Sequence, residues 1–429
     1  MNILFISDNF PPERNASASR VYERARYWVK WGNRVTVLTG ALNFPDGKVF
    51  DGYRNYWHKV EELDGIRVIR VKTFIAPNQG VGLRTLDFLS FMFAASIAGL
   101  FEKRPDVVAA TSPQFFSAVA GQFLARMQRR PFVFELSDLW PASIEAVGVM
   151  RSGIVLRAIE KIELALYHSS AKIVALTSSF REDLIRRGIP SEKIAVVING
   201  VDATLFAPRD RSSSLMQKLG LAHRFVVGYL GTLGMAHALE RVLDAAEILR
   251  NDDMIRFLFV GAGAARARLI REAADRGLSN VIFVPAQPKE AMPDYWSLCD
   301  IALVHLKNSV LFSTVIPSKI FEAMAMGLPV MLAAPEGEAT GIIRSNSAGV
   351  VVPPEQPMAL AQAVVELQRS GARLSELAAN SLRAATLYTR ERQAREMLSV
   401  LHEAAALKGM DITSDFSIGE NFRPPASSA

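Results

Sequence analysis

The stretch FVVGYL at residues 225–230 contains no charged residue and leads directly into Gly231-Thr232-Leu233-Gly234. A strand that is apolar at successive positions has both faces covered, as strands in parallel sheets do. Similar runs recur along the chain, separated by helix-length segments such as 17–31 and 238–250. They fall into two series, and each series predicts a doubly wound α/β sheet. The first comprises 2–7, 34–39, 66–71, 106–111, 131–136, 172–177 and 194–198, and the second 225–230, 256–260, 281–284, 301–306, 329–333 and 349–352.

A polar stretch at 199–214, which includes three consecutive serines, separates the two series and has the composition of a linker. We therefore predict two Rossmann-like domains, one at 1–205 and one at 206–384. A helix at about 385–408 is expected to pack back on the first domain, and residues 409–429 are expected to form a flexible tail. Two such sheets leave a cleft between the carboxyl ends of their strands, where open α/β sheets bind ligands.

The composition is that of a folded chain, because 50% of its 429 residues are hydrophobic and 21% are charged. Cys299 is the only cysteine, which excludes an intramolecular disulfide and any site built from several cysteines. The first eight residues lack the basic start of an export signal, so we expect a cytoplasmic protein. Asp-x-Asp is missing and the six histidines show no ligand spacing, so we expect no metal and no bound cofactor.

Basic residues are concentrated in the N-terminal half. Residues 1–200 contain 26 Lys and Arg against 19 Asp and Glu, within a net charge of +6 for the whole chain. A basic surface suits nucleic acid, anionic lipid or a diphosphate-bearing substrate. Zinc-finger spacing, an RNP-like aromatic motif and a block of five basic residues are all missing from the sequence, so we expect no nucleic-acid partner.

An uncharged apolar run occupies 88–101 (FLSFMFAASIAGLF). Its 14 residues fall short of the roughly 20 that a membrane-spanning helix needs, so we expect no span. Arg84 precedes the run, and Lys103 and Arg104 follow it, as basic residues flank a helix lying on a membrane surface. A helix buried in the core fits the same pattern, and both alternatives remain open.

The strongest local signal is PSKIFEAMAMGLP at 317–329. Ser318 as N-cap, Gly327 after the last turn and a proline as a stop predict a helix of about two turns that leads into a strand. Its amino end, with the Ser318 hydroxyl and the Lys319 ammonium, suits an anion. Glu322 lies one turn further on among apolar residues, where a carboxylate needs a partner. A ribose diol and a salt bridge both meet that need.

The segment ELSDLWP at 135–141 places Asp138 and Trp140 at the carboxyl end of a predicted strand. Asp138 either serves a ligand there or caps the helix that follows.

The segment GAG at 261–263 also follows a strand, but Arg266 stands where a dinucleotide fingerprint needs a small residue. We therefore interpret 261–263 as a turn. His237, which follows the glycine loop, either touches a ligand there or lies on the surface, and we expect the surface position.

Five segments together resemble the retaining GT-B glycosyltransferases of family four: FPPE at 10–13, NGVD at 199–202, GTLG at 231–234, FLFVGAG at 257–263 and the segment at 317–329. The branch that builds bacterial surface polysaccharides is the most similar, in particular transferases that resemble N-acetylfucosaminyltransferases. The resemblance covers roughly 1–405 and implies an α/β fold of the GT-B type, with two Rossmann-like domains facing across a cleft.

The resemblance also implies a nucleotide-sugar donor, UDP-linked, held by the second domain and an acceptor held by the first. Glu322 matches the second glutamate of the family's Glu-x7-Glu motif, which bonds the donor ribose, whereas Thr314 stands at the position of the first glutamate. The implied donor-side residues are Gly231, Thr232, Gly234, Pro285, Thr314, Ser318, Lys319 and Glu322. The implied acceptor-side residues are Asn15, Arg20, Asp138 and Trp140.

Two of these residues are candidates for catalysis. Breaking the bond from the anomeric carbon to a nucleoside diphosphate develops negative charge on the phosphates, which a fixed cation and backbone amides stabilise. Family members carry an Arg and a Lys after the glycine loop for this purpose, and we expect Lys319 to replace them. Asp138 is the candidate group that activates or positions the acceptor hydroxyl.

We therefore expect a glycosyltransferase of surface polysaccharide synthesis, whether of lipopolysaccharide or of exopolysaccharide. It would move a sugar to a polyprenyl-diphosphate-linked glycan with retention, at the cytoplasmic face of the inner membrane. The lipid acceptor is inferred from the branch, the basic first domain and the apolar segment 83–104. Two rivals remain: a GT-B nucleotide-sugar epimerase, and a non-catalytic nucleotide-sugar-binding component of a polysaccharide assembly complex.

Overall fold

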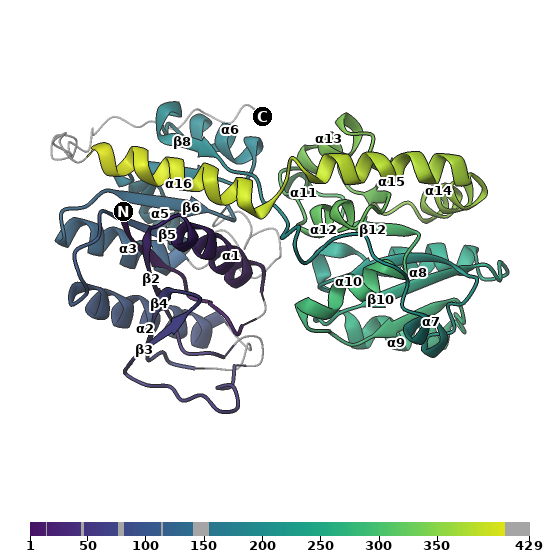
Figure 1. Ribbon diagram of the computed structural model, residues 1–429, viewed down its shortest axis with the longest axis horizontal. Helices are drawn as coiled ribbons and strands as arrows, with labels where there is room; N and C mark the ends of the chain where they lie inside the picture. The colour runs from purple at the N-terminus through teal and green to yellow at the C-terminus, as the bar shows by residue number, and fades with distance from the viewer. Residues whose placement is uncertain (14, 44–46, 76–80, 113–114, 140–153, 408–429) are drawn as a thin grey trace.

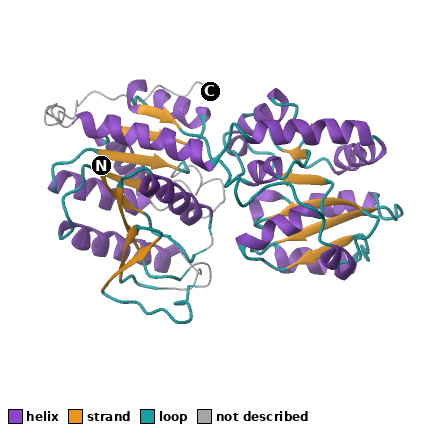
Figure 2. Ribbon diagram, in the orientation of Figure 1, coloured by secondary structure: helices purple, strands orange, loops and turns teal. Residues whose placement is uncertain are grey.

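The computed structural model describes residues 1–13, 15–43, 47–75, 81–112, 115–139 and 154–407. Trp140 and the predicted tail at 409–429 therefore lie outside the described residues. Figure 2 shows two groups of strands with helices on both sides of each group.

The first sheet has eight strands in the order β3-β4-β2-β1-β5-β6-β7-β8. All neighbours are parallel except β3, which pairs antiparallel with β4 at the edge. Its strands are β1 (Asn2–Ile6), β2 (Arg34–Thr39), β3 (His58–Leu63), β4 (Ile66–Val71), β5 (Val107–Thr111), β6 (Phe132–Leu136), β7 (Lys172–Ala175) and β8 (Ile194–Val196). The helices that follow these strands are α1 (Ala16–Lys30), α2 (Val81–Leu100), α3 (Phe115–Met127), α5 (Ile154–Ser169) and α6 (Ser178–Arg186).

The second sheet has six parallel strands in the order β11-β10-β9-β12-β13-β14. They are β9 (Phe225–Leu230), β10 (Ile255–Val260), β11 (Val281–Val284), β12 (Ile301–His305), β13 (Val330–Ala333) and β14 (Gly349–Val352). The helices here are α7 (Ser213–Lys218), α8 (Glu240–Ile248), α9 (Arg266–Asp275), α10 (Met292–Ser297), α11 (Val310–Ser313), α12 (Lys319–Ala325), α13 (Glu338–Ser345), α14 (Pro357–Arg369) and α15 (Gly371–Ala385). The strand order reverses at β9, so the glycine loop at 231–234 lies at the topological switch point.

The last helix, α16 (Arg390–Ala406), returns to the first sheet and crosses over it (Figure 1). Met397 and Leu401 are fully buried in a core cluster with residues of β1, β2 and β5. The indole of Trp28, on α1, donates a hydrogen bond of 2.8 Å to the carbonyl of Ala394. The chain therefore passes twice between the two sheets, and the two passages pair at an isolated bridge between Val201 and Thr389.

The carboxyl edges of the two sheets face each other, as two polar contacts show. Lys289, in the loop after β11, forms an ion pair with Glu23 of α1. Glu338, after β13, accepts hydrogen bonds from the backbone N–H of Ser179, at 2.6 Å, and from its hydroxyl, at 3.0 Å. Each contact joins segments that follow the carboxyl ends of strands, which confirms the predicted arrangement of two facing sheets.

Helix α2 is longer and more exposed than the uncharged run suggested. It has 20 residues, and only 17% of its apolar window Gly82–Leu100 is buried. Length and composition would allow this helix to cross a membrane. Phe91 and Ala95 pack into the core, whereas Phe93 and Ile97 are 62% and 60% exposed. The core-helix alternative is therefore wrong for most of the side chains of α2.

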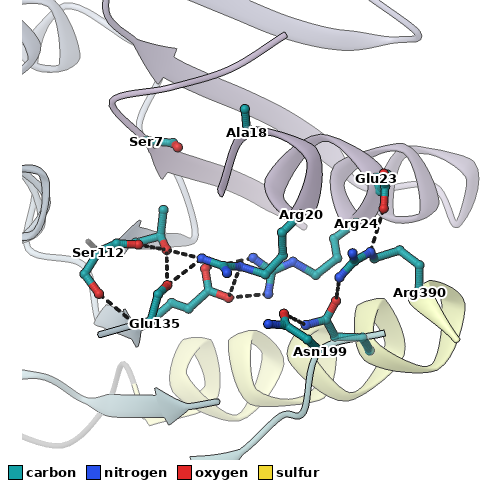
Figure 3. A network of polar contacts seen from close by, with 12 residues as sticks. Ser7, Ala18, Arg20, Glu23, Arg24, Ser112, Glu135, Asn199 and Arg390 are labelled. Atoms are coloured by element: carbon teal, nitrogen blue, oxygen red, sulfur yellow. Dashed lines mark hydrogen bonds and ion pairs between the residues drawn. The ribbon is translucent and has the colours of Figure 1, made fainter. Parts of the chain in front are cut away.

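A buried charge network fixes the carboxyl ends of β5 and β6 (Figure 3). Arg24 donates two hydrogen bonds to Glu135, of 2.5 and 2.8 Å, and the Nε of Arg20 lies 3.3 Å from the same carboxylate. Arg20 also donates to the hydroxyls of Thr111 and Ser137. Burial alone would raise the pKa of Glu135, but the two guanidinium groups outweigh it and lower this pKa to about 2. Glu135 is thus ionised throughout the physiological pH range.

Replacing Glu135 by Ala is expected to destabilise the protein by about 3–5 kcal/mol, because it leaves two buried guanidinium groups without a counter-charge. Urea unfolding followed by circular dichroism measures the effect. The control is Glu336→Ala: Glu336 is 68% exposed and pairs with the exposed Arg344, so this loss should stay below about 1 kcal/mol. Equal losses for the two variants would contradict the role given to the network.

Candidate functional site

Helix α12 is the element predicted from the segment at 317–329. It begins after Ser318, and Gly327, with φ of 71°, ends it before β13, as predicted. Ser318 itself has helical backbone angles, and its hydroxyl makes no cap hydrogen bond. The Ser318 hydroxyl therefore does not act as the side-chain cap that the sequence suggested.

Lys319, the first residue of α12, is buried with no hydrogen-bond partner on its Nζ among the described residues. The ammonium lies 3.6 Å from the centroid of the Tyr229 ring, on β9. A Cβ placed on Gly231 would lie 3.3 Å from Lys319 Nζ, so this glycine allows the glycine loop to approach the cation. Burial lowers the pKa of Lys319 to about 7, against the opposing effect of Glu322. The site thus holds an unpaired cation at the switch point of the second sheet.

The glycine loop is fixed by the neighbouring loop of β10. Gly231 N–H donates to the Val260 carbonyl at 2.9 Å, and Leu233 N–H donates to Ala262 at 2.8 Å. Only the amides of Thr232 and Gly234 therefore remain for a ligand among the described residues of this loop, fewer than a fully open loop would offer.

Gly261 and Gly263 allow the loop after β10 to pack closely against the glycine loop. A Cβ on Gly261 would lie 1.9 Å from the carbonyl oxygen of Gly231, and one on Gly263 would lie 2.3 Å from that of Leu233. The interpretation of 261–263 as a turn is confirmed, and its glycines are needed because two backbones pack directly on each other.

His237 closes the other side of the glycine loop. Its Nδ1 lies 3.2 Å from the His305 carbonyl, and Nδ1 of His305 lies 2.7 Å from the His237 carbonyl. His237 is half-buried, so its expected place on the open surface was wrong. Burial, together with the charge of Lys319, lowers the pKa of His237 to about 4, so this ring is neutral at pH 7.

Glu322 lies on α12 one turn beyond Lys319 and accepts a 3.4 Å hydrogen bond from the Trp296 indole. Burial raises the pKa of Glu322, and Lys289 and Lys319 oppose this rise. Lys289 also pairs with Glu23, whose other oxygen lies 2.7 Å from Nε of Arg390. Charges of alternating sign therefore run from Lys319 through Glu322 and Lys289 to the first domain.

The remaining donor-side residues, Pro285 and Thr314, have no hydrogen bond or ion pair with this group in the described part of the chain. Pro285 is exposed directly after β11, at the same edge of the sheet. Thr314 follows the last residue of α11, and its hydroxyl donates a hydrogen bond of 2.8 Å to the Leu311 carbonyl of its own turn. The contacts of the described residues do not bring Thr314 to Lys319.

The acceptor-side residues have mostly structural partners. The Asn15 side chain caps α1 by accepting a 2.8 Å hydrogen bond from Ala18 N–H. Arg20 is 5% exposed within the Glu135 network. Asp138 is half-buried, two residues after β6, and the prediction that it caps a following helix concerns residues outside the described ones.

Sequence reasoning missed three residues of this region. Tyr229 belongs to a continuously apolar strand, and nothing in this pattern indicates that its ring contacts a cation. Lys289 and Glu23 are single charges on polar segments, 266 positions apart, and they meet only through the fold. Within the described residues, no group of three or more His, Cys, Asp or Glu could hold a metal ion.

Two family models cover most of the chain. "Glycosyl transferase 4-like domain" matches residues 15–200, and "Glycosyl transferases group 1" matches residues 224–370. Among curated proteins, a putative colanic acid biosynthesis glycosyl transferase, WcaI of Escherichia coli, is 26% identical over 82% of this chain and 88% of its own length. A GDP-mannose-dependent alpha-mannosyltransferase of Mycobacterium tuberculosis is 25% identical over 86% of this chain and 89% of its own.

Solved structures share the fold. Sucrose-phosphate synthase of Thermosynechococcus elongatus superimposes with a TM-score of 0.75 at 18% identity, covering 94% of this chain and 99% of that one. HepE of Anabaena, in complex with UDP-glucose, gives a TM-score of 0.68 at 19% identity, and the match covers 94% of this chain and 100% of that one. The two sheets with their facing carboxyl edges, the order of the two domains and these relatives together identify the chain as a GT-B glycosyltransferase of the family-four-like group, with relatives in bacterial polysaccharide biosynthesis.

Proposed function

We propose that this protein moves a sugar from a UDP-linked donor to a polyprenyl-diphosphate-linked glycan, with retention at the anomeric carbon. The observation that carries the donor half is the buried, unpaired ammonium of Lys319 beside the glycine loop, with Glu322 one turn away. A buried cation without a partner is costly, and a diphosphate supplies the missing negative charge.

The donor lies along α12 in this proposal. The diphosphate contacts Lys319 and the amides of Thr232 and Gly234, and the ribose diol donates to the Glu322 carboxylate. Charge that develops on the leaving phosphate is then stabilised by a cation already in place. No metal or bound cofactor takes part. The curated relatives include a GDP-dependent enzyme, so the binding experiments compare UDP with GDP.

Glu322→Ala is expected to weaken UDP binding about 10- to 100-fold, because two hydroxyl hydrogen bonds to a carboxylate are lost. Isothermal titration calorimetry measures the affinity. Glu290→Ala, which removes an exposed carboxylate in the same domain, is the matched control and should bind as the wild type does. An unchanged affinity in Glu322→Ala would remove this residue from the donor site.

The acceptor is assigned to the carboxyl edge of the first sheet. Asp138 stands there directly after β6 and the Glu135 network. Asp8, after β1, stands at the same edge, and burial, Asp87 and Glu13 raise its pKa, whereas Arg84 lowers it. Arg84 and Asp87 belong to the first turns of α2, so these turns lie near the edge where an acceptor would bind. A lipid held against α2 would therefore reach the site.

Asp138→Asn should leave UDP affinity unchanged and lower sugar transfer by about 10²-fold, the usual contribution of a group that activates a hydroxyl. Transfer is followed with a panel of labelled UDP-sugars and lipid extract from host membranes. Asp51→Asn, an exposed position of the same domain, is the control. Full transfer by Asp138→Asn would end this assignment, and isomerised UDP-sugar without added lipid would favour the epimerase instead.

The membrane half of the proposal rests on the exposed face of α2. Its apolar side chains include Leu83, Leu86, Phe93, Ile97 and Leu100, and Phe101 follows at 85% exposure. Exposed basic residues stand at both ends, namely Arg84, Lys103 and Arg104. Phe123 and Met127 of α3, which packs on α2, extend the exposed apolar surface. A patch of this kind with basic flanks suits the surface of an anionic bilayer, so we place the enzyme at the cytoplasmic face of the membrane.

The double variant Phe93→Glu, Ile97→Glu should lose most of the binding to vesicles that contain anionic lipid, measured by flotation at low and high salt. Met358→Glu, which changes a residue 69% exposed on α14, is the control and should float as the wild type does. Circular dichroism and UDP affinity check that the double variant is folded. Failure of the wild type to float under any condition would refute the membrane assignment.

A further inference from the structure

We propose that Tyr229 is a positioning residue for the donor diphosphate: its ring holds the Lys319 ammonium, and its hydroxyl holds the glycine loop. A single side chain then sets the relative position of the two groups that contact the phosphates. This inference rests on the proposed function, since it names what fixes the donor site.

The contacts of Tyr229 reach both groups. The ring centroid lies 3.6 Å from Lys319 Nζ, and the phenolic O–H donates a 2.8 Å hydrogen bond to the carbonyl of Thr232. Tyr229 is 1% exposed. The ring centroids of Phe259 and His237 lie 5.9 and 5.8 Å from that of Tyr229. Burial and the hydroxyl hydrogen bond therefore hold the ring beside the ammonium.

An aromatic face is a suitable partner for a cation that must later meet a phosphate. It attracts the ammonium through its quadrupole, but it offers no carboxylate that would compete with the ligand. The two N–H groups of the glycine loop that remain for a ligand belong to Thr232 and Gly234, on either side of Leu233. The Tyr229 hydroxyl fixes this segment through the Thr232 carbonyl, so cation and amides stay aligned.

The titratable groups around Lys319 come from three elements. Glu322 on α12 is the negative charge that acts on it. His237, on the short helix Met235–His237, is neutral at pH 7, and burial raises the pKa of Tyr229 well above its usual value, so the phenol is neutral as well. A nucleoside diphosphate would be the strongest anion at this ammonium and would draw a proton onto it, since burial lowers the pKa of free Lys319 to about 7.

The sign of the pH dependence follows. The protonated form of Lys319 binds the anion, and its population falls above pH 7, so UDP affinity should fall roughly tenfold per pH unit between about pH 7.5 and 9. Phosphate is already fully ionised in this range, since its second pKa is about 6. Lys319→Met should bind UDP weakly and without this pH dependence.

Calorimetry of UDP binding from pH 6.5 to 9 tests Tyr229 against this baseline. Tyr229→Phe keeps the ring and loses the loop hydrogen bond, so affinity should drop about 2- to 10-fold at every pH. The midpoint, meaning the pH at which UDP affinity begins to fall because Lys319 loses its proton, should stay unchanged. Tyr229→Leu loses the ring as well, so affinity should drop more than tenfold and the midpoint should move to lower pH. Phe259→Leu removes a ring of the same layer that touches Tyr229, and it should keep the midpoint.

The outcomes distinguish a failure of the role given to Tyr229 from a failure of the proposed function. A midpoint in Tyr229→Leu that stays, or moves to higher pH, overturns the role of the ring, and so does an equal shift in Phe259→Leu. Unchanged affinity in Tyr229→Phe overturns the role of the hydroxyl, even if the Leu variant does not fold. A wild type that binds neither UDP nor GDP at any pH overturns the proposed function together with this inference.

Discussion

A buried ammonium without an anionic hydrogen-bond partner is the constraint from which the geometry of the second domain follows. Lys319 is buried, and its Nζ meets the ring of Tyr229 but no hydrogen-bond acceptor among the described residues. Such a cation is tolerated because the surrounding backbone is fixed: Gly231 leaves room for it, and Gly261 and Gly263 allow the loop of β10 to support the glycine loop. In the proposed donor complex, the diphosphate would offset the free energy that burial of this charge costs.

Contacts between charged and polar side chains connect the two domains. Glu23 is shared between Arg390, at the start of the returning helix, and Lys289, from the opposite domain. Lys289 in turn acts on Glu322, so the carboxylate proposed to receive the ribose senses a cation that is tied to α1. Glu338 makes a second link through Ser179. Both links join segments that follow the carboxyl ends of strands, so side-chain contacts hold these edges of the two domains together.

Much of the fold could be predicted from the sequence, because continuous apolar runs are a direct consequence of burial on both faces. All thirteen predicted runs overlap strands of the two parallel sheets. The strand that was missed, β3, alternates between exposed and partly buried residues and pairs antiparallel at the edge, so it carries no such run. Gly327 was predictable from local backbone rules. Tyr229 and Lys289 were not, since their roles arise from contacts through space. The same holds for Arg20, whose partners Thr111, Glu135 and Ser137 are distant in the sequence, whereas Asn15 caps its own helix.

Helix α2 of the first domain carries polar residues in its first turns and exposed apolar residues along the rest of its length. Helix α2 begins with Arg84 and Asp87 close to Asp8, at the carboxyl edge of the sheet, and then presents a bare apolar face toward its other end. A soluble acceptor would gain nothing from that face, whereas a lipid-linked diphosphate needs an apolar surface for its chain and a polar edge for its head group. In the proposed function both requirements are met by one helix, because its first turns lie near Asp8 and most of its remaining length is exposed and apolar. Exposed apolar area is costly for a protein free in water, and this cost is the physical argument for the lipid-linked acceptor that we propose.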